Sequence, residues 1–188
     1  MGVFTSLKNH FIIAMPNLAD PYFHHCVIYV CEHSPQGAMG IIINFPLNLH
    51  LGEILENMAI ASHDEKVNNM TILAGGPIQQ ERGFVLHTSG NKHWESSLEL
   101  NEDITITTSK DILEAIASHK GPEQALLALG YAGWEAGQLE RELAENSWLL
   151  SPVSPKILFE LPPEERWKAA GELVGVKMDL LSHDIGHA

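Results

Sequence analysis

The chain has 188 residues, enough for one domain that buries its own core without a disulfide or a metal ion to hold it together. Its 11 Lys and Arg stand against 24 Asp and Glu, a formal charge of −13, and the basic residues are scattered. This charge speaks against direct binding to nucleic acid and against adhesion to an anionic membrane. Without an apolar run of about 20 residues or a secretory signal pattern, and with only two cysteines, the sequence predicts a soluble cytoplasmic protein.

The first third of the sequence predicts a short strand followed by a β-hairpin. The strand is expected over 10–16, where the apolar run HFIIAMP ends at Pro16. The segments CVIYVCE (26–32) and AMGIIINF (38–45) are rich in strand-forming residues, and HSPQG between them has the composition of a type I turn. Residues 26–45 are therefore expected to form the hairpin.

Helix and strand signals are mixed in the middle of the chain. Leu51, Ile54, Leu55 and Met58 have the spacing of one helix face. Apolar or alternating segments bounded by turn residues predict further strands at 70–76, at 82–88 and, as a hairpin or edge pair, at 97–108.

A helix is predicted over 108–121, with Thr108 and Asp111 as a capping box at its start and Gly121 as its stop. The next segment, PEQALLALGYAGW (122–134), fits either a short helix or a buried strand.

Two more helices are predicted near the C-terminus. The segment 135–148 buries Leu139 and shows its charges to water, and 162–175 has Trp167 on its inner face. Residues 182–188 are expected to form a flexible tail. Strands and helices do not alternate regularly, so we expect one α+β domain over residues 1–188 rather than a parallel doubly wound sheet.

The segment FHHCVIYVCEH (23–33) contains three histidines, both cysteines and a glutamate, the composition of a metal or redox site. In a strand, however, Cys26 and Cys31 face opposite sides with Cα atoms about 16 Å apart. They can neither form a disulfide nor share a zinc ion. Cys31 and His33 are expected to share a face about 6.6 Å apart, which leaves a thiol-dependent enzyme as an alternative. We predict neither a metal site nor a cofactor.

Two glycine-rich segments could line a ligand site. In LAGGPIQQERGF, Gly75 and Gly76 would let the backbone approach a ligand closely, and Arg82 could bind an anion with its forked guanidinium. The alternative is a tight turn with Arg82 on the surface. In GYAGWE, Trp134 could form the wall of a pocket, although close strand packing is the more ordinary role of the neighbouring glycines.

Several segments, taken in order, resemble the YqgE/AlgH family of bacterial proteins. They are FIIAMPNLADPYF, VIYVCEHSPQGAMGIIINFP, LAGGPIQQERGFVLHT, TTSKDILEAIA, LLALGYAGWEAGQLERELAENSWL and the final GHA. The resemblance spans essentially the whole chain and implies a compact α+β domain with a largely antiparallel, barrel-like sheet flanked by helices. The activity of the family is essentially uncharacterised, and the AlgH name implies transcriptional regulation of alginate synthesis. The family usually reads Asn-Lys-Pro where this chain has Asn44, Phe45 and Pro46, so a ligand role of that lysine would not carry over.

The sequence shows no nucleophile elbow, no His-Glu-x-x-His and no Cys-x-x-Cys. We therefore expect a non-enzymatic cytoplasmic module that binds a small molecule or a protein partner. The residues predicted to line its cleft are Glu32, His33, Asn44, Gly75, Gly76, Arg82 and Trp134. One alternative is an enzyme with a scattered site, a hydrolase or a thiol-dependent enzyme that uses Cys31 with His33. The other is a transcriptional regulator, for which the net charge favours an indirect role.

Overall fold

The computed structural model of the protein describes residues 3–18 and 20–185. The strands are β1 (His10–Ala14), β2 (Val27–Ser34), β3 (Gly37–Ile42), β4 (Pro46–His50), β5 (Thr71–Ala74), β6 (Ile78–Thr88), β7 (Ser97–Glu99), β8 (Ile104–Thr107), β9 (Ala125–Glu135) and β10 (Trp148–Pro152). The helices are α1 (Leu51–Asn57), α2 (Glu65–Asn68), α3 (Lys110–Ala117), α4 (Gln138–Ala144), α5 (Pro163–Leu173) and α6 (Met178–Ile185), with a π-helical turn η1 (Lys156–Glu160) before α5.

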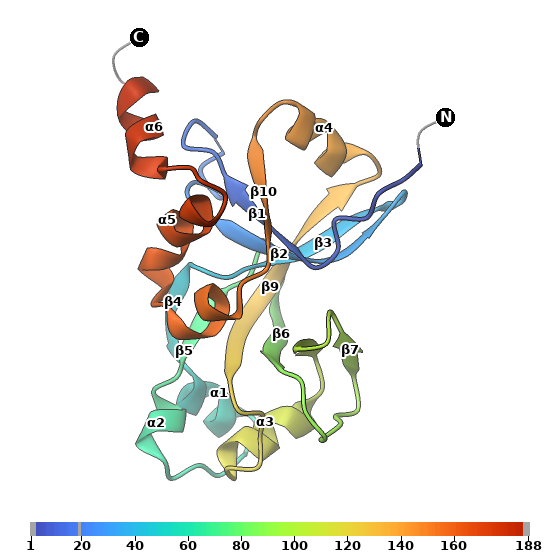
Figure 1. Ribbon diagram of the computed structural model, residues 1–188. Helices are drawn as coiled ribbons and strands as arrows, with labels where there is room; N and C mark the ends of the chain where they lie inside the picture. The colour runs from blue at the N-terminus through green and yellow to red at the C-terminus, as the bar shows by residue number, and fades with distance from the viewer. Residues whose placement is uncertain (1–2, 19, 186–188) are drawn as a thin grey trace.

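The strands form one sheet in the order β10-β1-β2-β3-β9-β6-β8-β7, with β4 and β5 attached beside β9. All of these pairs are antiparallel except β5 with β9. Figure 1 shows β9 running through the middle of the molecule, with α4 at one end of the curled sheet and α1, α2 and α3 at the other, while α5 and α6 lie along one side. The predicted α+β class with a largely antiparallel, curled sheet is confirmed.

The two halves of the sheet meet where β9 passes the segment after β5. Residues 125–129 of β9 pair with β5 and β6, Tyr131 pairs with Ile78 of β6, residues 132–135 pair with β3, and Gly130 has a φ of +80°. A Cβ atom on Gly76 would lie 1.9 Å from the carbonyl carbon of Tyr131, and one on Gly75 would lie 2.4 Å from the carbonyl oxygen of Gly130. Backbone approaches backbone here, so glycine is required at these positions. The segment 122–134, ambiguous in sequence, is therefore mostly strand.

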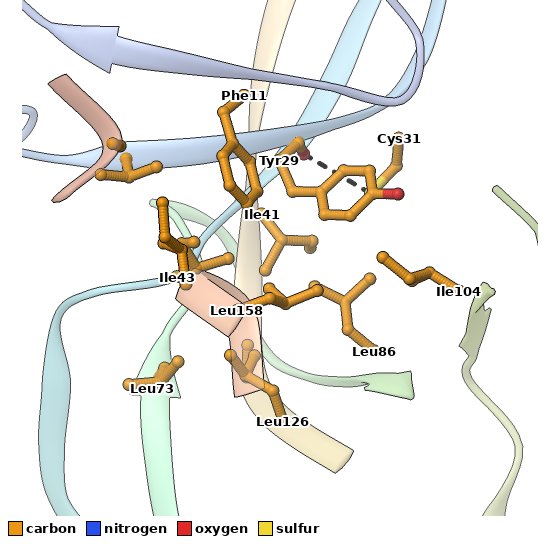
Figure 2. Packing of buried hydrophobic residues seen from close by; sticks show 14 of the residues in the cluster. Phe11, Tyr29, Cys31, Ile41, Ile43, Leu73, Leu86, Ile104, Leu126 and Leu158 are labelled. Atoms are coloured by element: carbon orange, nitrogen blue, oxygen red, sulfur yellow. Dashed lines mark hydrogen bonds between the residues drawn. The ribbon is translucent and has the colours of Figure 1, made fainter. Parts of the chain in front are cut away.

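Three apolar clusters stabilise this arrangement. The main cluster packs one face of the sheet against η1 and α5, with Phe11, Tyr29 and Leu158 fully buried (Figure 2). The second packs α4 against the opposite face of β1, β2 and β3 through Leu139. The third packs α1 and α3 against β6 and β9, with Ile112 fully buried in it. Because Cys26 belongs to the second cluster and Cys31 to the main one, the prediction that the two cysteines face opposite sides is confirmed.

Helix α5 is fixed to the sheet by polar contacts as well as by apolar packing. The Trp167 indole donates a hydrogen bond to the carbonyl oxygen of Ala14 at 2.9 Å, which confirms Trp167 on the inner face. The buried guanidinium of Arg166 donates to the carbonyl oxygens of Ile43 and Leu161. Burial lowers the pKa of Arg166 to about 10 although Glu164 raises it, so the side chain stays charged at neutral pH.

Helix α3 differs from its predicted limits at both ends. Its N-cap is Ser109 rather than Thr108, because the Thr108 amide donates to the Ser96 carbonyl oxygen and extends the β7–β8 ladder by one residue. The helix ends at Ala117, before the predicted stop at Gly121, and the left-handed residue that follows it is His119, with a φ of +61°.

Two strands were not predicted. β4 is exposed and pairs with β5 only near its two ends, so it carries no alternating apolar pattern. β10 is five residues long; only its first residue, Trp148, falls in the predicted helix 135–148, and no element was predicted for 149–152. The predicted flexible tail, 182–188, begins within α6, and 186–188 lie outside the described residues, so that prediction stays open.

Candidate functional site

The end of β2 carries residues that the sequence singled out, and a β-bulge decides where they point. The pairing of β2 with β3 shifts register between Val30 and Glu32, so Cys31 is an extra residue in β2. An inserted residue reverses the alternation of side chains beyond it. Cys31 packs into the main cluster, whereas His33 lies on the other face beside Glu140 of α4. The prediction that Cys31 and His33 share a face is therefore wrong.

The Cys31 thiol is buried with 1% of the residue exposed, and it donates to the carbonyl oxygen of Tyr29 at 3.5 Å (Figure 2). Burial raises the pKa of Cys31 well above its usual range, and the nearby carboxylate of Glu32 raises it further. A nucleophilic thiol needs both exposure and ionisation, and Cys31 has neither in this structure. The geometry thus gives no support to Cys31 with His33 as a catalytic pair.

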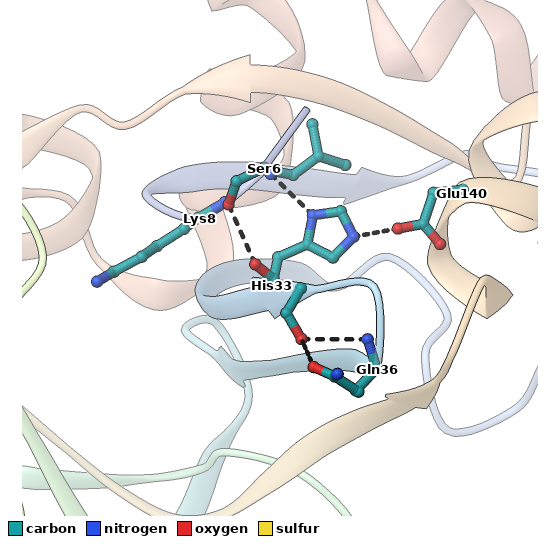
Figure 3. A network of polar contacts seen from close by, with 7 residues as sticks. Ser6, Lys8, His33, Gln36 and Glu140 are labelled. Atoms are coloured by element: carbon teal, nitrogen blue, oxygen red, sulfur yellow. Dashed lines mark hydrogen bonds and ion pairs between the residues drawn. The ribbon is translucent and has the colours of Figure 1, made fainter. Parts of the chain in front are cut away.

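His33 connects three parts of the chain (Figure 3). Its Nδ1 accepts a hydrogen bond from the Leu7 amide at 2.8 Å, and its Nε2 donates to the Glu140 carboxylate. The Phe4 ring lies against the imidazole, with ring centroids 4.8 Å apart. Because Nδ1 accepts from an amide, the proton of the neutral ring is on Nε2, where Glu140 requires it. His33 therefore holds the N-terminal segment against α4.

The contact with His33 lowers the pKa of Glu140. Partial burial raises the pKa of its carboxyl group, but its own backbone amide and the His33 ring together lower it by more. The pKa of Glu140 consequently lies below its ordinary value, and the carboxylate stays ionised near neutral pH.

Glu32 and Arg82 line the same hollow, which has a volume of about 530 Å³. The Arg82 guanidinium lies 5.2 Å from the centroid of the Phe84 ring, and its polar contact to Gln79 is long, at 3.5 Å. Among the described residues, neither Glu32 nor Arg82 forms an ion pair. We call this space the polar hollow; it is lined by Cys31, Glu32, Met39, Arg82, Phe84, Glu95, Ser96, Ser97, Leu98, Ile106, Thr108 and Tyr131.

The structure does not gather all seven predicted site residues in one cleft. Glu32 also lines a neighbouring hollow with His33 and Trp134. Trp134 is 7% exposed, and its indole donates to Glu142, so it is mainly a packing residue.

Asn44, Gly75 and Gly76 line neither hollow. The Asn44 side chain accepts from the Val27 amide at 2.9 Å and donates to the His25 carbonyl oxygen at 2.8 Å, so it joins the ends of β2 and β3. Gly75 and Gly76 approach another strand rather than open space, as described above. Ligand binding by these three residues stays a prediction without geometric support.

Aromatic residues of the polar hollow were missed. Phe84 follows Arg82 by two positions in a segment predicted to be a strand, so the shared face could have been inferred from alternation. Tyr131 could not have been placed, because its segment was ambiguous and the left-handed Gly130 changes the direction of β9.

Among the described residues, no three His, Cys, Asp or Glu side chains are arranged to hold a metal ion. No helix in the described part of the chain is long and apolar enough to cross a bilayer.

Comparison with known proteins assigns the family. A family model described as AlgH-like (DUF179) matches residues 11–179. The chain belongs to the AlgH-like family. A UPF0301 protein of Thioalkalivibrio sulfidiphilus is 52% identical over 188 residues and 100% of both chains, and one of Legionella pneumophila is 48% identical with the same coverage.

Two solved structures share the fold. The solution structure of the AlgH protein from Pseudomonas aeruginosa has 51% identity and a TM-score of 0.80, covering 100% of this chain and 99% of that one. Protein DIP2367 from Corynebacterium diphtheriae has a TM-score of 0.76 over 97% of this chain and 94% of that one, at 17% identity, and shows similarity of fold alone. The family assignment from sequence is therefore confirmed.

Proposed function

We propose that this AlgH-like chain is a non-enzymatic module that binds a small zwitterionic molecule in the polar hollow. One observation carries the proposal: Glu32 and Arg82, of opposite charge, line the same hollow, and neither forms an ion pair with another described residue. The one hydrogen bond of the Arg82 guanidinium to a described residue, Gln79, is long. A volume of about 530 Å³ falls in the ordinary range of small-molecule sites. The guanidinium would bind a carboxylate in forked geometry, and Glu32 would accept from an ammonium group.

Any regulatory role would then act through the bound molecule or a protein partner. Direct contact with nucleic acid is disfavoured because the chain has a formal charge of −13 and the polar hollow combines Arg82 with two carboxylates, Glu32 and Glu95. The two free, buried cysteines are typical of a reducing compartment, which supports a cytoplasmic location.

Calorimetric titration of the purified chain with a panel of free amino acids tests the proposal. At least one should bind at a 1:1 ratio, and Arg82→Gln and Glu32→Gln should each weaken binding about tenfold, since each removes a charged hydrogen-bond partner. The matched control is Arg141→Gln, because Arg141 is exposed on α4 and does not line the polar hollow. Equal affinity of wild type and Arg82→Gln would contradict the proposal.

A further inference from the structure

A second space, of about 270 Å³, lies between α1, α3 and the strands β6 and β9. We call it the apolar cavity. Its lining is largely apolar and includes Ile54, Val85, Leu113, Leu127 and Leu129. Phe84 and Thr108 line both this cavity and the polar hollow, but the two share no charged residue, so the apolar cavity would take a ligand of different chemistry.

Gly83 lines the apolar cavity and leaves it unfilled. It pairs directly with Leu129 in β9, and a Cβ atom on Gly83 would meet only the Cδ2 atom of Leu129, at 3.9 Å. The backbone of Gly83 is not left-handed, so a larger residue would fit without strain. Gly83 is exposed, so the cavity is open beside it, and the absence of a side chain there leaves room for a ligand to enter.

Polar side chains also line the apolar cavity, and those of Thr108, Lys110 and Glu81 are exposed. Thr108 is exposed there, and no described residue hydrogen-bonds to its hydroxyl. The Lys110 ammonium lies 4.0 Å from Glu114, a long and exposed pair that leaves it available to another anion. Glu81, also exposed, is the one acidic residue that lines this cavity.

We infer that the apolar cavity binds a medium-chain carboxylate, with the hydrocarbon chain between α1 and α3 and the carboxylate at Thr108 and Lys110. An apolar cavity of about 150 Å³ accepts benzene, so one of about 270 Å³ has room for a chain of roughly eight to ten carbons. Lys110 supplies the positive charge that the head group requires, and the Thr108 hydroxyl supplies a donor. The exposed Glu81 carboxylate lowers affinity by repulsion.

Calorimetric titration of the full chain with decanoate, below the concentration at which it forms micelles, tests this inference. Wild type should bind one decanoate, and Gly83→Leu should reduce the affinity at least tenfold while the melting temperature stays equal or rises. Lys110→Gln should reduce the affinity about threefold to tenfold, and Glu81→Gln should raise it. Acetate, which lacks the chain, should not bind at this site.

The controls separate this site from the polar hollow. Arg82→Gln should leave decanoate affinity unchanged, because Arg82 does not line the apolar cavity. Gly90→Leu should also leave it unchanged, since a Cβ atom on Gly90 meets nothing within 4 Å. If Gly83→Leu fails to fold, Gly83→Val supplies the same test with a smaller side chain. Absence of decanoate binding to wild type, or unchanged affinity in the Gly83 variants, would overturn the inference.

Discussion

Two glycine regions beside β9 use the same residue in opposite ways. At the place where β9 passes the segment after β5, which we call the crossing, Gly75 and Gly76 lie close to β9. A Cβ atom on either would fall within 2.4 Å of backbone atoms. At Gly83, across from Leu129, a Cβ atom would meet its nearest neighbour at 3.9 Å. Gly75 and Gly76 therefore allow two backbone segments to pack closely, while Gly83 leaves a space unfilled. Only the second kind indicates a binding site.

The largest expected effect is that of Gly76→Ala. The added Cβ atom would lie 1.9 Å from the Tyr131 carbonyl carbon, and neither backbone can move without breaking the junction of the two sheet halves. We expect a loss of about 4 kcal/mol in the free energy of unfolding, or failure to fold. Urea denaturation followed by circular dichroism measures it, with Gly90→Ala as the exposed control. A loss under about 1 kcal/mol would show that the crossing is not close-packed.

The next effect concerns Asn44, which joins strand ends next to the crossing. Asn44→Ala would remove the acceptor of the Val27 amide and the donor to the His25 carbonyl oxygen. Leaving these buried groups unpaired should cost about 1–3 kcal/mol of unfolding free energy. Asn48→Ala is the matched control, since Asn48 is exposed in β4. Equal unfolding midpoints in urea for the two variants would be inconsistent with this role.

The pH dependence of stability tests the burial of His87, whose partner Thr107 lines the apolar cavity. His87, buried in β6, accepts from the Thr107 hydroxyl at 2.7 Å, and burial lowers its pKa below the ordinary 6.5 despite its contact with the Thr88 carbonyl oxygen. Below pH 6.5 the unfolded chain binds a proton that the folded chain does not, so stability falls as pH falls.

The expected slope from His87 is at most about 1.4 kcal/mol per pH unit below pH 6.5. Burial also lowers the pKa of His25, so the wild-type curve contains both contributions. Unfolding free energies of wild type and His87→Asn, measured at pH 7.5, 6.5 and 5.5, isolate the contribution of His87. The variant should lose less stability per pH unit than wild type. Parallel curves would mean that His87 titrates alike in both states.

The smallest expected effect is that of Gly83→Ala. The new methyl group fits in open space, and replacing glycine in a strand reduces the entropy of the unfolded chain. We expect the free energy of unfolding to stay the same or to rise by about 0.5 kcal/mol. Measured beside Gly76→Ala, it gives the contrast between the two regions directly. A loss of more than about 1 kcal/mol would mean that the space beside Gly83 is not available to a side chain.

The family, the α+β class and most strands and helices could be predicted from sequence, because local patterns carry them. The face of His33 could not, because one inserted residue at Cys31 reverses the alternation, and nothing local marks the bulge. The role of the Gly-Gly pair could not be predicted either. Close approach to a ligand and close approach to a strand require the same residue, and only the pairing of β9 distinguishes them.

Ligand binding by the predicted cleft residues stays a prediction. Glu32 and Arg82 do line one hollow, and Tyr131 and Phe84 complete it from strands whose register depends on the whole sheet. The apolar cavity was not predicted, because a cavity is a property of what long-range packing leaves unfilled and has no sequence pattern of its own.

Methyl NMR spectra of the protein under xenon pressure test the contrast between packed and open regions most directly. Xenon enters apolar cavities, so we predict chemical-shift changes at the methyl groups of Ile54, Leu113 and Leu129, around the apolar cavity, and none at Ile41 and Ile43 of the main cluster. Gly83→Leu should abolish the changes. Shifts spread over both regions, or unchanged by Gly83→Leu, would contradict the account.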